Sequence, residues 1–290
     1  MRVSLIGDYG CEELARAFRE LGWTVNQHPE NMVIRDGLGR EKVPLNLVKA
    51  SLYILVGDLG DARKLPKWAH PLVTWSIDPH YSRCFEWGLQ NARLADLSFV
   101  TEKPAVTEYT RRGAQAQWLP LACEDQPKPF VATEIYDLTF VGSLGPGTAE
   151  DRNRICALVK KRCINCYIGT AWGDQLTQVY GQSKIILNSS WMTTYRNIPP
   201  RVFHVLHAQK CLLTDECAGL LDLFEEDKHL VVYRSDEDLV AKATELLADP
   251  DKRNRIAEAG HVKAMQDHTF KNRAKKILKE SMKHGLIPHV

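Results

Sequence analysis

The chain has 290 residues, 44% of them hydrophobic, which is enough to fill the cores of two modest domains. Its 38 basic and 36 acidic residues leave a formal charge of +2, so no strongly charged partner is implied and nucleic acid is neither favoured nor excluded. No apolar run approaches the roughly 20 residues of a membrane span. The first residues predict a strand rather than a signal peptide, and the eight cysteines are scattered. Together these features predict a cytoplasmic protein with reduced thiols.

Strands and helices alternate through the first half of the chain. The predicted strands are residues 3–6, 23–26, 52–56, 70–77, 97–101 and 116–119, and the predicted helices are 12–21, 81–94 and 103–112. This alternation predicts one doubly wound domain, which we place at residues 1–125. The glycine turn after the first strand lacks the spacing of a dinucleotide fingerprint, so NAD binding is not expected.

Two polar residues follow the strand at 70–77. Asp78 and His80 lie just beyond the end of this strand, and parallel sheets bind their ligands at the carboxyl ends of their strands. Either side chain could act as a general base if it reaches an acceptor hydroxyl. The alternative for Asp78 is a turn former or helix cap.

The segment around residues 126–135 contains prolines among charged residues, which is typical of a linker between domains. We therefore expect a second domain at residues 136–290. It restarts with a strand at 137–141, followed by Gly142 and Ser143. A glycine-rich turn before a helix lets backbone N–H groups approach a phosphate, and the alternative is a plain loop.

A βαβ unit is predicted in the second domain. Residues 184–188 and 211–214 read as buried strands, and Pro199 and Pro200 can open the helix between them. Ligands bind at the carboxyl ends of such strands, and helix N-termini there attract anions. Asn188, Arg201 and the loop up to Arg196 fall at that edge.

Several short patterns in the second half also match a known family. They are Arg201-Val202-Phe203, Leu212-Leu213-Thr214-Asp215, residues 255–260 and His268-Thr269-Phe270 with Arg273, with weaker matches at Trp75, Asp78, 119–122 and 140–143. This part of the chain resembles group 1 glycosyltransferases of the GT-B type, in particular those related to spore-maturation (CgeB-like) enzymes. The resemblance implies two Rossmann-like domains facing across a cleft. It also implies transfer of a sugar from a nucleotide-sugar, with a UDP-sugar favoured and no metal required.

The resemblance assigns roles to residues of this chain. Lys184 or Arg201, with the backbone of Gly142 and Ser143, would bind the diphosphate of the donor. Asn188 and His204 would contact the ribose or the sugar, helped by Asp215, and Arg196 belongs to the same donor region. Asp78 or His80 would be the base if the reaction inverts the anomeric centre.

Two positions depart from the family pattern. His204 stands where the family usually has a glutamate, and Arg196 stands where the wider superfamily often has another. These departures keep open a non-catalytic protein that binds a nucleotide-sugar. A third possibility is a transferase that acts on modified bases in DNA. The acceptor is therefore predicted only as carbohydrate, protein or a modified DNA base.

Overall fold

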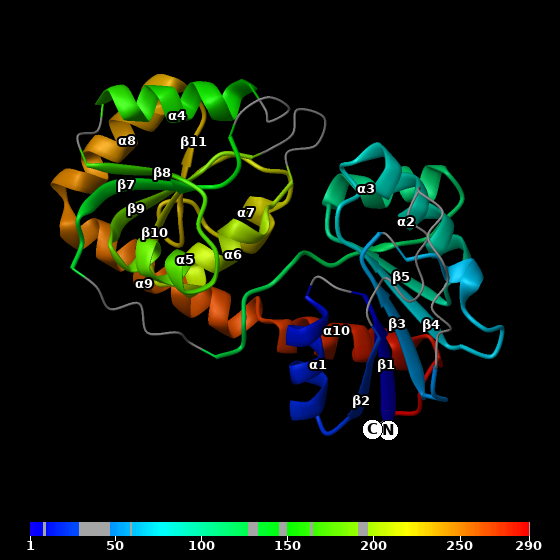
Figure 1. Ribbon diagram of the computed structural model, residues 1–290. Helices are drawn as coiled ribbons and strands as arrows, with labels where there is room; N and C mark the ends of the chain where they lie inside the picture. Colours follow the sequence, from blue (N-terminus) through cyan, green and yellow to red (C-terminus); the bar gives the residue numbers. More distant parts are fainter. Residues whose placement is uncertain are drawn as a thin grey trace. The chain divides into compact units, whose positions relative to one another are not determined.

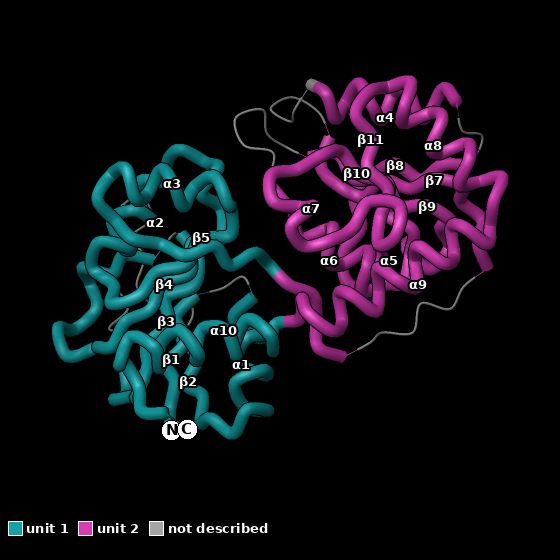
Figure 2. The backbone as a smooth tube through the Cα atoms, turned by 180° about the vertical axis from the view of Figure 1, so that it is seen from behind, with its two compact units in different colours: residues 1–121, 270–290 teal, residues 122–269 magenta. Residues whose placement is uncertain are grey.

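The computed structural model describes residues 1–7, 10–28, 47–58, 60–126, 133–144, 150–162, 165–190 and 197–289. The chain forms two compact units (Figure 2). Unit 1 contains Met1–Leu121 and Phe270–Val290, and unit 2 contains Ala122–Thr269.

The core of unit 1 is a parallel sheet of six strands in the order β2-β1-β3-β4-β5-β6. The strands are β1 (Arg2–Ile6), β2 (Thr24–His28), β3 (Leu52–Val56), β4 (Leu72–Ser76), β5 (Leu97–Val100) and β6 (Gln117–Trp118). Every residue of β3, β4 and β5 is buried, as expected of parallel strands that are covered on both faces. Because β2 and β3 lie on opposite sides of β1, the strand order reverses between β1 and β3.

Helices flank this sheet (Figure 1). They are α1 (Cys11–Glu20), α2 (Ser82–Leu94), α3 (Lys103–Arg111) and α10 (Phe270–Lys283), together with the short 3-10 helix η2 (Ala62–Lys64). Helix α1 buries Leu14, Ala17 and Phe18 and packs beside α10.

The last helix belongs to unit 1, whereas the sequence placed residues 136–290 together in the second domain. Its buried Arg273 donates from Nε to the Pro120 carbonyl oxygen at 2.6 Å and from Nη2 to the Leu121 carbonyl oxygen at 2.7 Å. Phe270 also lies against Trp75, with 6.4 Å between ring centroids. These contacts explain why α10 is fixed to the first sheet.

Unit 2 contains a second parallel sheet, in the order β11-β10-β9-β7-β8. The strands are β7 (Tyr136–Val141), β8 (Cys166–Gly169), β9 (Ser183–Asn188), β10 (Cys211–Asp215) and β11 (Val231–Tyr233). The helices are α4 (Glu150–Arg162), α5 (Gly173–Gly181), α6 (Pro200–His207), α7 (Leu220–Leu223), α8 (Asp236–Ala248) and α9 (Pro250–Asp267). In Figure 1, α4 and α8 cover one face of this sheet, and α5 and α6 cover the other. The strand order reverses between β7 and β9, which is where ligands of such sheets bind.

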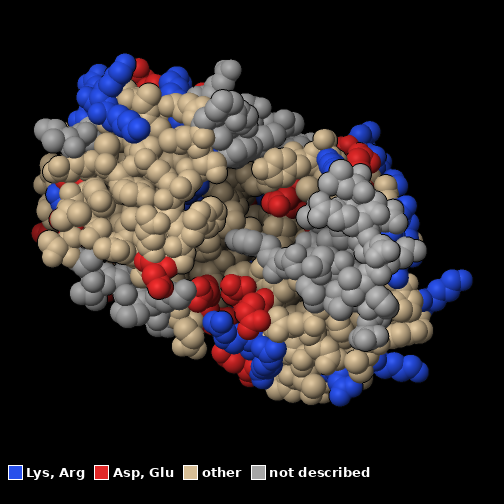
Figure 3. Space-filling view, viewed as in Figure 1, with Lys and Arg blue, Asp and Glu red and all other residues tan. Residues whose placement is uncertain are grey.

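The structure confirms the predicted α/β class, with two doubly wound parallel sheets. Helix α6 begins at Pro200, as the two prolines predict. Lys160, Lys161 and Arg162 gather at the exposed C-terminal end of α4 (Figure 3), where positive charge favours the helix dipole. Within the described ranges, no helix combines the length and apolar character needed to cross a bilayer.

Candidate functional site

Two guanidinium groups meet the ring of Phe140 near the carboxyl end of β7. The guanidinium carbon of Arg201, from the first turn of α6, lies 4.8 Å from the ring centroid, and that of Arg152, from α4, lies 5.5 Å away. Arg152 is buried and donates from Nη2 to the Ser189 carbonyl oxygen at 2.8 Å. Two cations thus converge on the edge of the sheet where its strand order reverses.

A hydrogen bond to Asn188 holds the Arg201 side chain in place. Its Nη1 atom donates to Oδ1 of Asn188 at 2.6 Å. Burial lowers the pKa of Arg201, while Tyr180 and Asp215 oppose this effect, and the group remains a cation at any physiological pH. Among the described residues, no carboxylate forms an ion pair with Arg201. A desolvated cation of this kind favours an anionic ligand.

Asn188 and Asp215 form the support beneath this arginine. Asn188 is fully buried and donates from Nδ2 to Oδ1 of Asp215 at 3.2 Å. The Asp215 carboxylate also accepts from the backbone N–H of Ser190 at 2.8 Å and from its hydroxyl at 3.0 Å. Because both side chains are buried, we interpret them as residues that orient Arg201, Asp215 acting through Asn188. The sequence predicted instead that they contact the nucleotide-sugar directly.

Gly142 leaves space for a neighbouring side chain and does not offer its N–H group to a phosphate. Its N–H group already donates to the Gly169 carbonyl oxygen at 2.8 Å, so the expected backbone contact to a phosphate is not available from this residue. A Cβ atom added at Gly142 would lie 2.5 Å from Nη2 of Arg201. Ser143, the other predicted backbone donor, is exposed at the same edge.

If Arg201 binds the diphosphate of a nucleotide, as the family resemblance implies, substituting Gly142 by alanine should weaken nucleotide binding. The new methyl group would displace the Arg201 guanidinium, and loss of a hydrogen bond to a charged group costs roughly 1.5–3 kcal/mol. We expect the dissociation constant for a nucleoside diphosphate, measured by calorimetry, to rise by about tenfold or more. Unchanged affinity in a folded Gly142→Ala variant would show that Arg201 does not touch the ligand.

The other residues predicted to bind the nucleotide-sugar do not all lie at this edge. Lys184 lies near the start of β9, four residues before Asn188, and its Nζ atom pairs with Oδ1 of Asp137 at 2.6 Å. At about 3.3 Å per residue, Lys184 is roughly 13 Å from the edge that carries Arg201, so the structure does not bring it to a diphosphate there. His204 is exposed on α6, three residues after Arg201. Arg196 lies outside the described residues.

At the carboxyl edge of the first sheet, the buried Asp58 fixes the turn after β4. Its carboxylate accepts from the backbone N–H groups of Ile77 at 2.9 Å and Asp78 at 2.5 Å, and from the Ser76 hydroxyl. Burial raises the pKa of Asp58 to about 7, and the hydrogen bond from Ser76 works against that rise. The hydroxyl of Tyr109 donates to the Ser76 oxygen at 3.2 Å and extends this buried cluster.

The two predicted bases lie in the turn that Asp58 holds. Asp78 is exposed. The surrounding protein still removes part of the water around its carboxyl group and thereby raises its pKa, and the charge of His80 works against this rise. The imidazole Nδ1 of His80 lies 2.6 Å from Oε1 of Glu102, and these side chains are only 8% and 1% exposed. The sequence identified Asp78 and His80 but missed Glu102 and Asp58. Glu102 comes shortly after the end of β5, and Asp58 comes shortly after the end of β3. A polar residue just beyond a buried strand is the pattern in the sequence that could have identified both.

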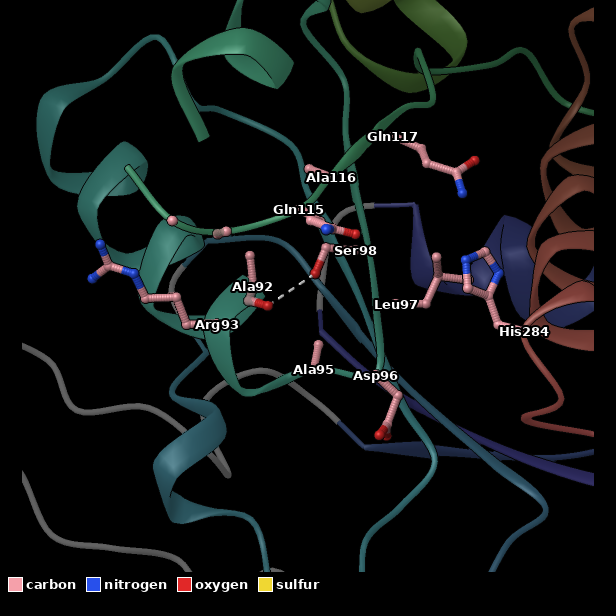
Figure 4. Close-up of a pocket in the computed structure, with 12 residues that line it drawn as sticks. Ala92, Arg93, Ala95, Asp96, Leu97, Ser98, Gln115, Ala116, Gln117 and His284 are labelled. Atoms are coloured by element: carbon pink, nitrogen blue, oxygen red, sulfur yellow. Dashed lines mark hydrogen bonds between the residues drawn. The ribbon is translucent and has the colours of Figure 1, made fainter. Parts of the chain in front are cut away.

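A separate depression lies at the opposite edge of the first sheet, where β5 and β6 begin (Figure 4). Its volume is about 340 Å³. Asp96, Ser98, Gln115, Gln117 and His284 are among its lining residues. None of the candidate residues named above lines it. In the part of the chain that the structure describes, no group of three or more His, Cys, Asp and Glu side chains could hold a metal ion.

The chain is similar in sequence to one protein family and in fold to several solved structures. Residues 136–279 match the family described as glycosyl transferase-like, and no curated protein sequence matches the chain. Sucrose-phosphate synthase from Thermosynechococcus elongatus superposes with a TM-score of 0.64 at 11% identity, covering 98% of each chain. Anabaena Alr3699/HepE in complex with UDP-glucose has a TM-score of 0.66 at 11% identity, covering 97% of this chain and 100% of the other.

A third structure is an alpha-glucosyltransferase in complex with UDP and a 13-mer DNA containing a HMU base. Its TM-score is 0.63 at 10% identity, and the match covers 98% of this chain and 99% of the other. At these identities the structures establish the fold, with two Rossmann-like domains of the GT-B type. Residues 136–279 thus match the glycosyl transferase-like family, and the whole chain has the GT-B fold of the glycosyltransferases on which it superposes.

Proposed function

We propose that the chain transfers a sugar from a nucleotide-sugar, most favourably a UDP-sugar, to an acceptor hydroxyl. The observation that supports this proposal is the convergence of Arg152 and Arg201 on Phe140 at the edge of the second sheet where its strand order reverses. Similar folds in complexes with UDP-glucose and UDP support the choice of nucleotide. We further propose that the enzyme is of the spore-maturation type, is cytoplasmic, and requires no metal.

In this proposal Arg201 contacts the diphosphate, and Arg152 adds positive charge to the same edge. A guanidinium fork matches phosphate oxygens in geometry as well as in charge. The exposed His204, one turn along α6, contacts the ribose with a single hydrogen bond, because a neutral imidazole cannot accept two at once. The carboxylate usual at that position would accept both ribose hydroxyls, so His204 predicts a weaker grip on the ribose.

The transfer step needs three changes at the sugar. The bond between the anomeric carbon and the leaving diphosphate oxygen breaks, and its electron pair stays on the diphosphate. A bond forms between that carbon and the acceptor oxygen, and the acceptor hydroxyl releases its proton to a base. Fixed cations that face the developing charge stabilise the transition state without reorganising, which is the role proposed for the arginines.

The proposal is tested by the thermal stability of the purified protein with a panel of nucleotides and nucleotide-sugars. A ligand at a hundred times its dissociation constant adds about 2.7 kcal/mol to the free energy of unfolding. We expect a raised melting temperature with one uridine diphosphate ligand, and loss of this shift in Arg201→Ala.

Arg154→Ala is the matched control for the panel. Arg154 is an exposed residue of α4 that pairs with Asp151 and Asp236. This variant should keep the ligand-induced shift. If no nucleotide or nucleotide-sugar stabilises the wild-type protein, or if the shift survives in Arg201→Ala, the proposed donor site is wrong.

A further inference from the structure

The depression at the start of β5 and β6 is built entirely from residues of unit 1. Its volume of about 340 Å³ falls at the lower end of the roughly 300–1,000 Å³ that small-molecule sites occupy. Asp78 and His80 follow the carboxyl end of β4, at the other edge of the same sheet. None of the roles assigned so far therefore accounts for this space.

Small side chains keep the depression open. Four alanines line it, from the end of α2 and from the segments that lead into β5 and β6. Ala92 and Ala114 are buried, and Ala95 and Ala116 are half-buried, so their methyl groups provide an apolar floor. Such a floor can pack against the C–H groups of a ligand.

Glu280 of α10 determines which atoms two of the lining side chains have left for a ligand. Its buried carboxylate accepts from Nε2 of Gln117 at 3.1 Å, and its backbone carbonyl oxygen lies 2.8 Å from Nδ1 of His284. Figure 4 shows both side chains beside the red helix α10. Because these oxygens can only accept, Gln117 keeps its Oε1 atom, and Nδ1 of His284 carries a proton. Nε2 of the neutral imidazole is then an acceptor, and neither Oε1 nor Nε2 has a hydrogen-bond partner among the described residues.

The other polar residues of the depression add one more acceptor and several donors. Oδ2 of Asp96 lies 2.7 Å from Nδ1 of His70 and accepts from the N–H group of Leu72, which leaves Oδ1 without a partner in the described ranges. Arg93 donates one hydrogen bond to the described part of the chain, from Nη2 to a backbone carbonyl oxygen at 2.5 Å. The exposed amide of Gln115 makes none there. A ligand in the depression therefore meets both acceptors and donors.

We propose that this depression binds a saccharide unit. One carboxylate and one guanidinium line it, so their charges balance and a neutral ligand is favoured over an anion or a cation. A hydroxyl group donates and accepts at once, which matches the mixture of groups left without partners. A neutral molecule that combines several hydroxyl groups with an apolar face of C–H groups is a sugar ring.

This inference goes beyond the proposed transfer and does not depend on it. Every lining residue belongs to unit 1, whereas the residues proposed to bind the nucleotide-sugar belong to unit 2. The sugar has two possible sources, a free monosaccharide or one unit of a longer saccharide chain, and both offer the same hydroxyl groups.

NMR of protein labelled with carbon-13 at its alanine methyl groups detects a ligand at the site itself. The probes are glucose, galactose, mannose and N-acetylglucosamine, added without nucleotide. The signals of Ala95 and Ala116 are assigned by their loss in Ala95→Ser and Ala116→Ser. We expect at least one sugar to shift both signals to saturation, with a dissociation constant on the order of 1 mM, as is ordinary for a ligand of this size.

Gln117→Leu tests one of the acceptors that Glu280 orients. It should raise the dissociation constant of the bound sugar by about tenfold, the effect of losing one hydrogen bond, and His284→Ala should do the same. The matched control is Gln178→Leu, which replaces an exposed glutamine of α5 in unit 2 and should leave the dissociation constant unchanged. Unaltered alanine signals away from the depression show that each variant is folded.

Three results would overturn the proposal. In the first, no sugar shifts the signals of Ala95 and Ala116 even far above the millimolar range. In the second, glycerol shifts them as much as the sugars do. In the third, Gln117→Leu and His284→Ala both bind the sugar as tightly as Gln178→Leu does. Because the titrations contain no nucleotide, none of these results bears on the proposed donor site.

The linear trisaccharide built from the bound sugar distinguishes the two sources. If only the monosaccharide shifts the two alanine signals, the site holds a free sugar. If the trisaccharide binds as tightly or more tightly, the site holds one unit of a saccharide chain.

Discussion

Replacing Asp58 by asparagine should make the protein more stable at and above neutral pH, by up to about 4 kcal/mol in the free energy of unfolding, and should change little near pH 4. The reason is burial, which raises the pKa of this carboxyl group from 3.8 to about 7. Each unit of difference between the folded and unfolded pKa corresponds to about 1.36 kcal/mol.

The sign follows from the protons that each state holds. Between pH 4 and pH 7 the unfolded chain has lost the Asp58 proton while the folded protein still binds it. Stability rises with pH only where the unfolded state binds more protons, so here it falls as pH rises through this window. Asparagine removes this dependence and keeps the geometry, since its oxygen can accept from Ile77 and Asp78 while its NH2 group faces Ser76.

Urea denaturation of wild type and Asp58→Asn at several pH values measures this difference. Asp61→Asn is the matched control and should have the opposite sign. Burial alone would raise the pKa of Asp61, but hydrogen bonds from Arg63 outweigh it and lower the pKa, so the carboxylate stabilises the fold above the unfolded pKa. Parallel pH profiles for wild type and Asp58→Asn would show that Asp58 is ionised in the folded protein throughout.

The second large effect is expected at Gly260 in α9. Alanine in a helix interior is ordinarily favoured over glycine by about 1 kcal/mol. At this position, however, a Cβ atom would overlap the carbonyl oxygen of His229 and approach Cδ2 of Leu206 to 2.8 Å. Overpacking costs about 1–3 kcal/mol, and here the obstacle is backbone, so we expect Gly260→Ala to lower the free energy of unfolding by about 3 kcal/mol.

The measurement is again chemical denaturation, with Glu258→Ala as the control. Glu258 is exposed on the same helix, and its substitution should change stability by less than about 0.5 kcal/mol. A Gly260→Ala protein as stable as wild type would mean that α9 can shift away from His229 at little cost.

Much of the fold could be predicted from local pattern. The short apolar runs at 52–56 and 211–214 are typical of buried parallel strands, and both form such strands. The partner of α10 could not be predicted in the same way. Its buried Phe270, Ala274 and Ile277 show that the helix must pack, but an apolar stripe does not specify against which sheet.

The candidate site, too, could be predicted from the sequence only in part. Asn188 and Arg201 were expected at one edge, and a hydrogen bond joins them there. Lys184 was misplaced because its position near the start of the strand puts it at the other edge. The pairing of Glu102 with His80 depends on neighbouring strands 22 residues apart in sequence, and Glu102 by itself reads as the residue before a helix. Such contacts require the sheet order, which no local pattern supplies.

We propose that Arg152 and Arg201, at the edge of the second sheet, bind the diphosphate of the donor. Isothermal titration with UDP and with uridine tests it most directly, because the two ligands differ only in that diphosphate. We expect UDP to bind at least about 100-fold more tightly than uridine, which is roughly 2.7 kcal/mol or two charge-assisted contacts. Equal affinities, or no binding of UDP, would contradict it.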